Sequence, residues 1–190
     1  MLYSLYGSKR FIMNDEIKIT RDVDAHLVPS GDKITLKKGE SVQITQALGG
    51  SYTVIIRGNM AQINSENADA LGKEKTTPKK AETIQGDFHE DMVWDQLKTC
   101  YDPEIPVNIA ELGLIYDCRP YELKDGQWRI EIKMTLTAPG CGMGPSITSE
   151  VKSKVEAIPG VAEASVDLVW EPQWNQEMMS EEARLQLGMM

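Results

Sequence analysis

The residues best suited to chemistry lie in one short segment between a strand-like run and a helix-like run. Residues 135–145 read Thr-Leu-Thr-Ala-Pro-Gly-Cys-Gly-Met-Gly-Pro, with Cys141 as their only thiol. A cysteine just ahead of a helix meets free backbone N–H groups and the positive end of the helix dipole, which stabilise a thiolate. Because the thiolate is the nucleophilic and metal-binding form, Cys141 is the candidate reactive group. A tight turn that holds a small, half-buried cysteine explains the same pattern equally well.

The residues around Cys141 suit a loop that lets a partner approach the backbone. Glycine allows such an approach, and Pro145 suits the first position of a helix, where its missing N–H has no intrahelical partner. If the preceding strand runs to residue 137, alternation places two threonine hydroxyls on one face and directs them toward the loop. Threonine is also simply a good strand residue. The residues expected to support Cys141 in this loop are Thr135, Thr137, Pro139, Gly140, Gly142 and Gly144.

A second unusual segment, residues 101–117, precedes the predicted strands. Two prolines hold it extended, and it carries the carboxylates of Asp102, Glu104 and Glu111. One interpretation makes these carboxylates an acidic wall beside the cysteine loop. A well-packed loop with solvated acids is the alternative, and spacing along the chain does not decide between the two.

The other reactive side chains give little support for catalysis. Cys100 lies on the apolar face of a predicted helix and suits core packing, while Cys118 belongs to no motif. Three cysteines without a C-x-x-C pair predict neither a disulfide framework nor a zinc site within one chain. An enzyme with Cys141 as nucleophile needs a base, usually histidine, and His26 and His89 are far from the loop in sequence. A catalytic role for Cys141 is therefore weakly supported by the residues.

Hydrophobic periodicity from residue 87 onward predicts elements in the order α-β-β-α-β. A crossover from strand through helix to strand favours parallel pairing, so the three strands form one mixed sheet with helices on one face. Ser180 suits the N-cap of a further helix in a tail rich in Trp and Met, which we expect to cover the sheet or a second copy of the chain. The predicted elements are a helix at 88–100, strands at 114–121 and 127–137, a helix at 146–157 and a strand at 161–169.

The N-terminal part of the chain shows β signals. Short apolar runs within residues 25–63 are separated by turn residues, and Gly49-Gly50 predicts a hairpin. We expect a small barrel- or sandwich-like β domain with a structural or partner-binding role. The chain is thus predicted to be an α+β protein, with a small β domain in residues 1–71, a charged linker in residues 72–86 and a mixed-sheet domain in residues 87–190.

Charge is divided unevenly along the chain. Residues 1–80 carry 12 basic and 9 acidic side chains, a net charge of +3, whereas residues 81–190 carry 8 and 20, a net charge of −12. The acidic part argues against a nucleic-acid partner. Apolar runs stay well short of the length of a membrane span, and the N-terminus lacks the order of a signal peptide. We therefore expect a cytoplasmic protein without a membrane partner.

The two motifs together resemble a known family. Residues 102–117, which begin Asp-Pro-Glu-Ile-Pro-Val, and residues 134–145 closely resemble the iron–sulfur cluster assembly domain shared by SufT, PaaD-like proteins and cytosolic iron–sulfur targeting factors. The resemblance runs from about residue 87 to residue 190. The N-terminal stretch around residues 39–54 resembles the extra domain of SufT-like chains, although Met60 stands where a basic residue is expected.

The resemblance implies a non-catalytic auxiliary factor in the maturation of iron–sulfur proteins. Its partners would be the iron–sulfur assembly machinery and client apoproteins. Cys141 matches the family's functional cysteine, and Asp102, Pro103 and Glu104 match its Asp-Pro-Glu motif. Clusters prefer several thiolate ligands, so one well-placed thiol favours a transient cluster completed by a homodimer, a partner or a small thiol. An adaptor that holds no cluster and a PaaD-like factor for one oxygenase complex are the alternatives.

Overall fold

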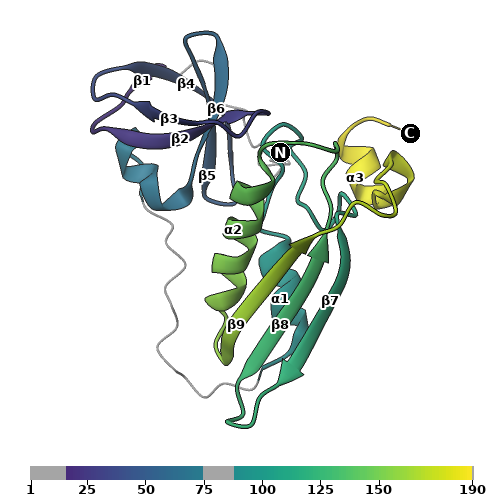
Figure 1. Cartoon of the computed structure of the whole chain (residues 1–190). Coiled ribbons are helices and arrows are strands. Elements are labelled where there is room, and N and C mark those ends of the chain that lie inside the picture. The colour runs from purple at the N-terminus through teal and green to yellow at the C-terminus, as the bar shows by residue number, and fades with distance from the viewer. Residues whose placement is uncertain (1–15, 75–87, 190) are drawn as a thin grey trace, which may run out of the picture.

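The computed structural model describes residues 16–74 and 88–189. In the first range, antiparallel strands form a six-stranded sheet in the order β1-β4-β5-β6-β2-β3. A short 3₁₀ helix follows this sheet (Figure 1). The elements are β1 (Glu16–Lys18), β2 (Val23–Val28), β3 (Lys33–Leu36), β4 (Ser41–Leu48), β5 (Ser51–Ile56), β6 (Asn59–Ile63) and η1 (Ser65–Leu71).

The hairpin predicted at Gly49-Gly50 is confirmed. These two residues join β4 to β5, Leu48 pairs with Ser51, and both glycines have positive φ angles. Sequence patterns missed β1 and β6. The first is only three residues long, and the second reads Asn-Met-Ala-Gln-Ile, with little β-branched character. The predicted barrel or sandwich detail stays a prediction.

The second range contains the predicted α-β-β-α-β order, followed by a short helical tail. Strands β7 and β8 are antiparallel, and β8 and β9 are parallel, so the sheet is mixed as expected. Helices α1 and α2 lie on the same face of this sheet (Figure 1). The elements are α1 (Glu90–Leu97), β7 (Ile115–Glu122), β8 (Trp128–Met134), α2 (Gly144–Glu156), β9 (Val161–Leu168), η2 (Gln176–Met178) and α3 (Glu181–Gln186).

Two boundaries near the cysteine loop differ from the prediction. Strand β8 ends at Met134 rather than residue 137, although Thr135 N still donates to the carbonyl of Leu114 at 2.8 Å. Thr135 is buried and does not share an exposed strand face with Thr137. Helix α2 begins at Gly144, so Pro145 occupies its second position instead of its first.

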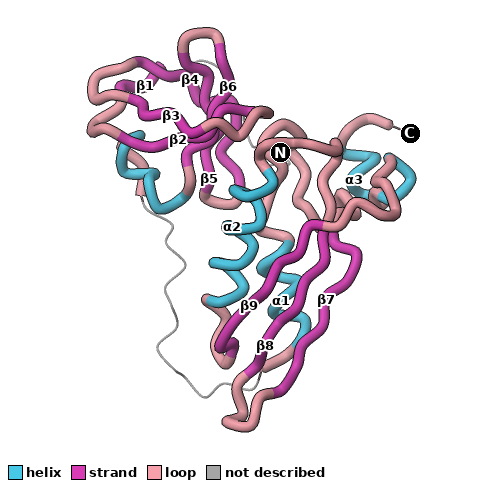
Figure 2. The backbone as a smooth tube through the Cα atoms, viewed as in Figure 1, coloured by secondary structure: helices cyan, strands magenta, loops and turns pink. Residues whose placement is uncertain are grey.

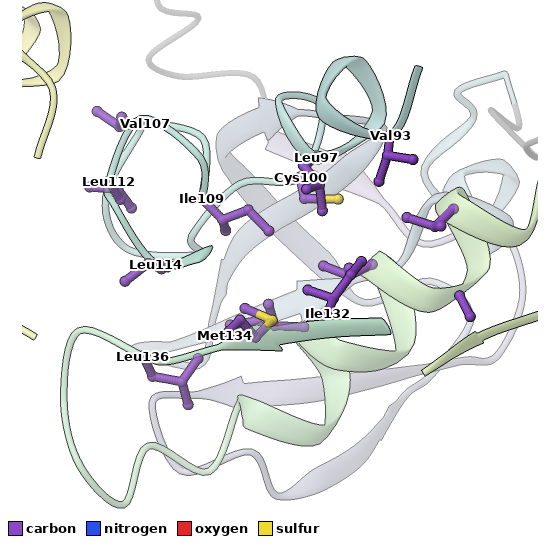
Figure 3. Packing of buried hydrophobic residues seen from close by; sticks show 14 of the residues in the cluster. Val93, Leu97, Cys100, Val107, Ile109, Leu112, Leu114, Ile132, Met134 and Leu136 are labelled. Atoms are coloured by element: carbon purple, nitrogen blue, oxygen red, sulfur yellow. The ribbon is translucent and has the colours of Figure 1, made fainter. Parts of the chain in front are cut away.

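Each part of the chain has its own apolar core. The N-terminal core gathers side chains such as Val54 and Ile63 between the strands and η1. The C-terminal core joins α1, α2, the sheet and residues 107–114, and Figure 3 shows Leu97 beside Cys100, across the cluster from Ile132 and Met134. The predicted division into domains at residues 1–71 and 87–190 stays a prediction. The predicted linker lies mostly in residues 75–87, outside the described residues.

Two loops of the C-terminal part connect its helices to its strands. Figure 2 shows that a long loop separates α1 from β7, and a second loop joins β8 to α2. Within the described ranges, no helix is long and apolar enough to cross a membrane.

Candidate functional site

Buried apolar residues hold the cysteine loop at both ends. Leu136, just after β8, is 3% exposed, and Met143, the N-cap of α2, is fully buried. Gly144 packs so tightly that a Cβ there would lie 2.9 Å from Leu168 Cδ1. Between these anchors, Pro139 and Gly140 are exposed and Cys141 is half-buried. The loop is thus firmly placed at its base, with Cys141 near the surface.

The N-terminal domain contacts this loop directly. The turn after β2, residues 29–31, lies against Cys141 and Gly142. Gly142 N donates to Pro29 O at 3.1 Å, and the thiol of Cys141 lies 3.8 Å from the same oxygen. A Cβ on Gly142 would lie 1.6 Å from Ser30 O, so only glycine fits there. Residues 29–32, Pro-Ser-Gly-Asp, have the composition of an ordinary hairpin turn, so the sequence alone indicates no role for them.

The other two cysteines are packing residues. Cys100 is buried beside α1, and burial raises the pKa of its thiol to about 12. Cys118 lies in β7, where burial, followed by the nearby carboxylates Glu90 and Asp117, raises the pKa of its thiol to about 11. Both groups stay protonated near neutral pH. The prediction of core packing for Cys100 is confirmed.

Asp102 organises its own loop. Its side-chain oxygen Oδ1 accepts the backbone N–H of Glu104 at 2.8 Å and that of Ile105 at 2.9 Å. Burial raises the pKa of this carboxyl, while the two backbone hydrogen bonds lower it, and the net direction is upward. The carbonyls of Asp102 and Pro103 accept hydrogen bonds from the N-terminal sheet, not from the cysteine loop.

The acidic wall beside the cysteine loop stays one of two interpretations of Asp102, Glu104 and Glu111. Glu104 is exposed, and the carbonyl of Glu111 accepts from Ser180 N in the C-terminal tail at 2.9 Å. Throughout residues 16–74 and 88–189, the structure shows no group of three or more His, Cys, Asp or Glu that could hold a metal ion. A cluster at Cys141 would therefore depend on ligands from another molecule.

A buried ion pair forms a second contact between the domains. Lys154 and Glu150 of α2 lie 2.7 Å apart, with side chains only 8% and 13% exposed. Lys154 Nζ also donates to Thr99 O at 2.8 Å and to Gly49 O at 2.9 Å, which lies in the hairpin between β4 and β5. Lys154 falls on the apolar face of α2, and a lysine there was the signal that could have revealed this contact.

The tail lies over the loop between α1 and β7. Trp174 Nε1 donates to Leu112 O at 2.8 Å, and Gln186 Nε2 donates to Pro106 O at 2.7 Å. The predicted N-cap is confirmed, because Ser180 Oγ accepts from Ala183 N at 3.1 Å. The tail thus covers a loop of its own domain.

These features define a class of protein: a small mixed-sheet domain with one thiol ahead of its second helix, joined to a β domain. The family model for iron–sulfur cluster assembly proteins matches residues 90–166, which include Cys141. An Fe-S protein maturation auxiliary factor from Porphyromonas gingivalis is 50% identical over 99 residues, which are 52% of this chain and 90% of that protein. The chain belongs to the iron–sulfur cluster assembly protein family.

Two further proteins each match about half of the chain. The Fe-S protein maturation auxiliary factor SufT of Staphylococcus aureus is 39% identical over 87 residues, which are 46% of this chain and 94% of that protein. The crystal structure of a domain of unknown function from Bacillus anthracis is 37% identical, covers 53% of this chain and 92% of that chain, and has a TM-score of 0.48. The matched segments make up nearly all of both relatives named as maturation factors, so these relatives have no room for a β domain like that of β1–β6.

Proposed function

We propose that this protein is a non-catalytic auxiliary factor in the maturation of iron–sulfur proteins and that Cys141 is the group that meets the cluster or the client. The observation that carries this proposal is the position of the thiols within a chain of this family. Burial keeps Cys100 and Cys118 protonated, whereas Cys141 lies in a surface loop.

A single thiol limits what the protein does with a cluster. Iron–sulfur clusters are held mostly by several cysteine thiolates. Cys141 would therefore supply one ligand, and the remaining ligands would come from a second copy, a client, the assembly machinery or a small thiol. Such incomplete ligation suits brief handover better than storage.

An adaptor that holds no cluster is the second candidate. It is favoured by the absence, among the described residues, of other metal-binding side chains grouped with Cys141. In that case the cysteine loop touches clients and the β domain recruits them. A role in maturing one oxygenase complex would be a special case of either candidate.

The test is complementation in cells that lack their own maturation factor. Cys141→Ser is compared with the matched control Cys118→Ser, and the activity of an iron–sulfur client enzyme is measured at equal protein levels. We expect the control to restore client activity and Cys141→Ser to fail. Full restoration by Cys141→Ser would exclude the proposed role of this thiol.

Reconstitution separates the cluster carrier from the adaptor. The protein is incubated anaerobically with iron and sulfide, and visible absorption and mass in solution are recorded. Absorption bands that depend on Cys141 and accompany a dimer would identify a cluster shared between two copies. Wild-type protein without such bands, but with the complementation result above, would identify the adaptor.

A further inference from the structure

We propose that the turn 29–31 of the β domain is a reversible cover that controls access to Cys141. This proposal rests on the proposed function of Cys141, but its test does not require a cluster. In the structure, the thiol of Cys141 is directed toward Pro29 O at 3.8 Å, and Gly142 N donates to that oxygen at 3.1 Å. The side of the thiol that faces Pro29 is therefore closed to an incoming metal ion or electrophile.

The fit between turn and loop is a fit of main chain against main chain. A Cβ on Gly31 would lie 1.9 Å from Gly142 O, and one on Gly142 would lie 1.6 Å from Ser30 O. Side chains bend away from such contacts, but backbone atoms do not. The cover therefore has a shape that matches the cysteine loop at the position of the reactive thiol.

The cover can open without breaking an apolar core. The two cores are separate, and Val28 is the one apolar side chain of residues 16–74 that packs against the C-terminal core. Polar contacts also join the domains, including the hydrogen bond from Lys154 to Gly49 described above. Gln46 Nε2 donates to Asp102 O at 3.0 Å, and Thr53 Oγ1 donates to Pro103 O at 3.2 Å. Water replaces such hydrogen bonds on opening, and domains joined by polar interfaces move relative to one another.

The β domain would then supply a function that relatives of about half this length do not carry within the same chain. A closed cover protects the thiol between encounters. A client or assembly protein that displaces the turn would expose Cys141 at the moment of handover. After opening, water or the partner would form hydrogen bonds with Pro29 O and with the N–H of Gly142.

The test compares alanine substitutions at two glycines with similar positive φ angles. Gly31 and Gly39 both have positive φ angles, +74° and +89°, but a Cβ on Gly39 meets nothing within 4 Å. Alanine at either position therefore introduces similar strain, and only Gly31→Ala pushes the turn off the loop. The rate at which iodoacetamide alkylates Cys141 is measured by mass spectrometry, which separates Cys141 from the other two thiols.

We expect Gly31→Ala to raise the alkylation rate of Cys141 by about fivefold or more. Loss of one or two hydrogen bonds changes the equilibrium between the closed and open turn by about that factor. Gly39→Ala should leave the rate unchanged. Hydrogen exchange at the Gly142 amide should accelerate in Gly31→Ala alone. Equal alkylation rates in the two variants, with or without faster exchange, would overturn the proposal.

A second variant covers the case in which Gly31→Ala does not fold. The double variant Gln46→Ala/Thr53→Val removes the two hydrogen bonds to Asp102 O and Pro103 O without touching the turn. It should raise the alkylation rate of Cys141 to a smaller extent, and an unchanged rate would count against the cover. Failure of Cys141→Ser to impair maturation would remove the proposed function but leave this result intact.

Discussion

The two contacts between the domains differ in the groups that hold them together. The contact at the cysteine loop depends on atoms that are absent, because Gly31 and Gly142 have no side chains to keep the backbones apart. The contact under the hairpin of β4 and β5 depends on atoms that are present, because Lys154 joins Glu150, Thr99 and Gly49. Adding a methyl group therefore damages the first contact, and removing a side chain damages the second.

The largest effect is expected from Lys154→Ala. It leaves Glu150 buried without its cation and leaves two carbonyls without a donor, so the free energy of unfolding should fall by about 3 kcal/mol. Lys152→Ala is the matched control, because the Lys152–Glu156 pair is more exposed and its atoms lie 3.8 Å apart. The control should lose less than about 0.5 kcal/mol. Urea unfolding of both variants checks this, and equal losses would show that Lys154 is not an anchor.

An added methyl group should also damage the charged contact, which sharpens the comparison. A Cβ on Gly49 would lie 2.0 Å from Thr99 O, and the φ angle of +62° is unfavourable for alanine. Gly49→Ala should therefore destabilise the protein by about 2 kcal/mol, against about 1 kcal/mol for Gly58→Ala, whose positive φ carries strain without a nearby atom. Thermal unfolding of the two variants measures the difference. Identical midpoints would mean that the close approach of Gly49 to Thr99 does not contribute to stability.

A smaller, pH-dependent effect is expected from Asp102, whose loop accepts hydrogen bonds from Gln46 and Thr53. Its pKa is raised in the folded protein, chiefly by burial, so the folded state holds this proton more tightly than the unfolded chain. Stability from this group is complete below the ordinary Asp pKa of about 4 and is lost as pH rises through the higher, folded pKa. Asp102→Asn keeps an oxygen for the two N–H groups and does not titrate. The melting temperature of this variant relative to wild type should therefore rise from pH 4 to pH 7, and a flat difference would contradict the assignment.

The smallest effect is expected from Ser51→Ala. Ser51 Oγ donates to Glu150 Oε2 at 3.3 Å, while the other oxygen of that carboxylate, Oε1, pairs with Lys154. Loss of one such hydrogen bond should cost about 1 kcal/mol or less. If Ser51→Ala destabilised the protein as much as Lys154→Ala, the hydroxyl rather than the ammonium would be the main support of Glu150. Urea unfolding again provides the measurement.

The features that the sequence predicted correctly are those set by residues close together in the chain. Apolar periodicity revealed α1, α2 and the strands of the mixed sheet, and the run of glycine and proline around Cys141 revealed the loop. The boundaries at Met134 and Gly144 were missed because they depend on tertiary packing, such as the burial of Thr135 and Met143. Local pattern carries no record of these partners.

The contacts across the domains were beyond prediction for the same reason. Pro29 and Cys141 are 112 positions apart, and Gly49 and Lys154 are 105 apart. The residues of a hairpin turn do not indicate which distant loop the turn contacts. Lys154 is the exception, because a charged residue on the apolar face of a helix indicates a buried polar contact. The sequence does not indicate which residue forms that contact.

The close approach of residues 31 and 142 also has a consequence for variation among related proteins. A chain that lacks the β domain has no carbonyl above the residue that follows its loop cysteine, so that position is free to carry a side chain. A chain that carries the domain must keep glycine there and in the covering turn, or lose the fit at both together. The two positions should therefore change as a pair when the N-terminal domain is gained or lost, and an alignment of both kinds of chain would record the history of that fusion.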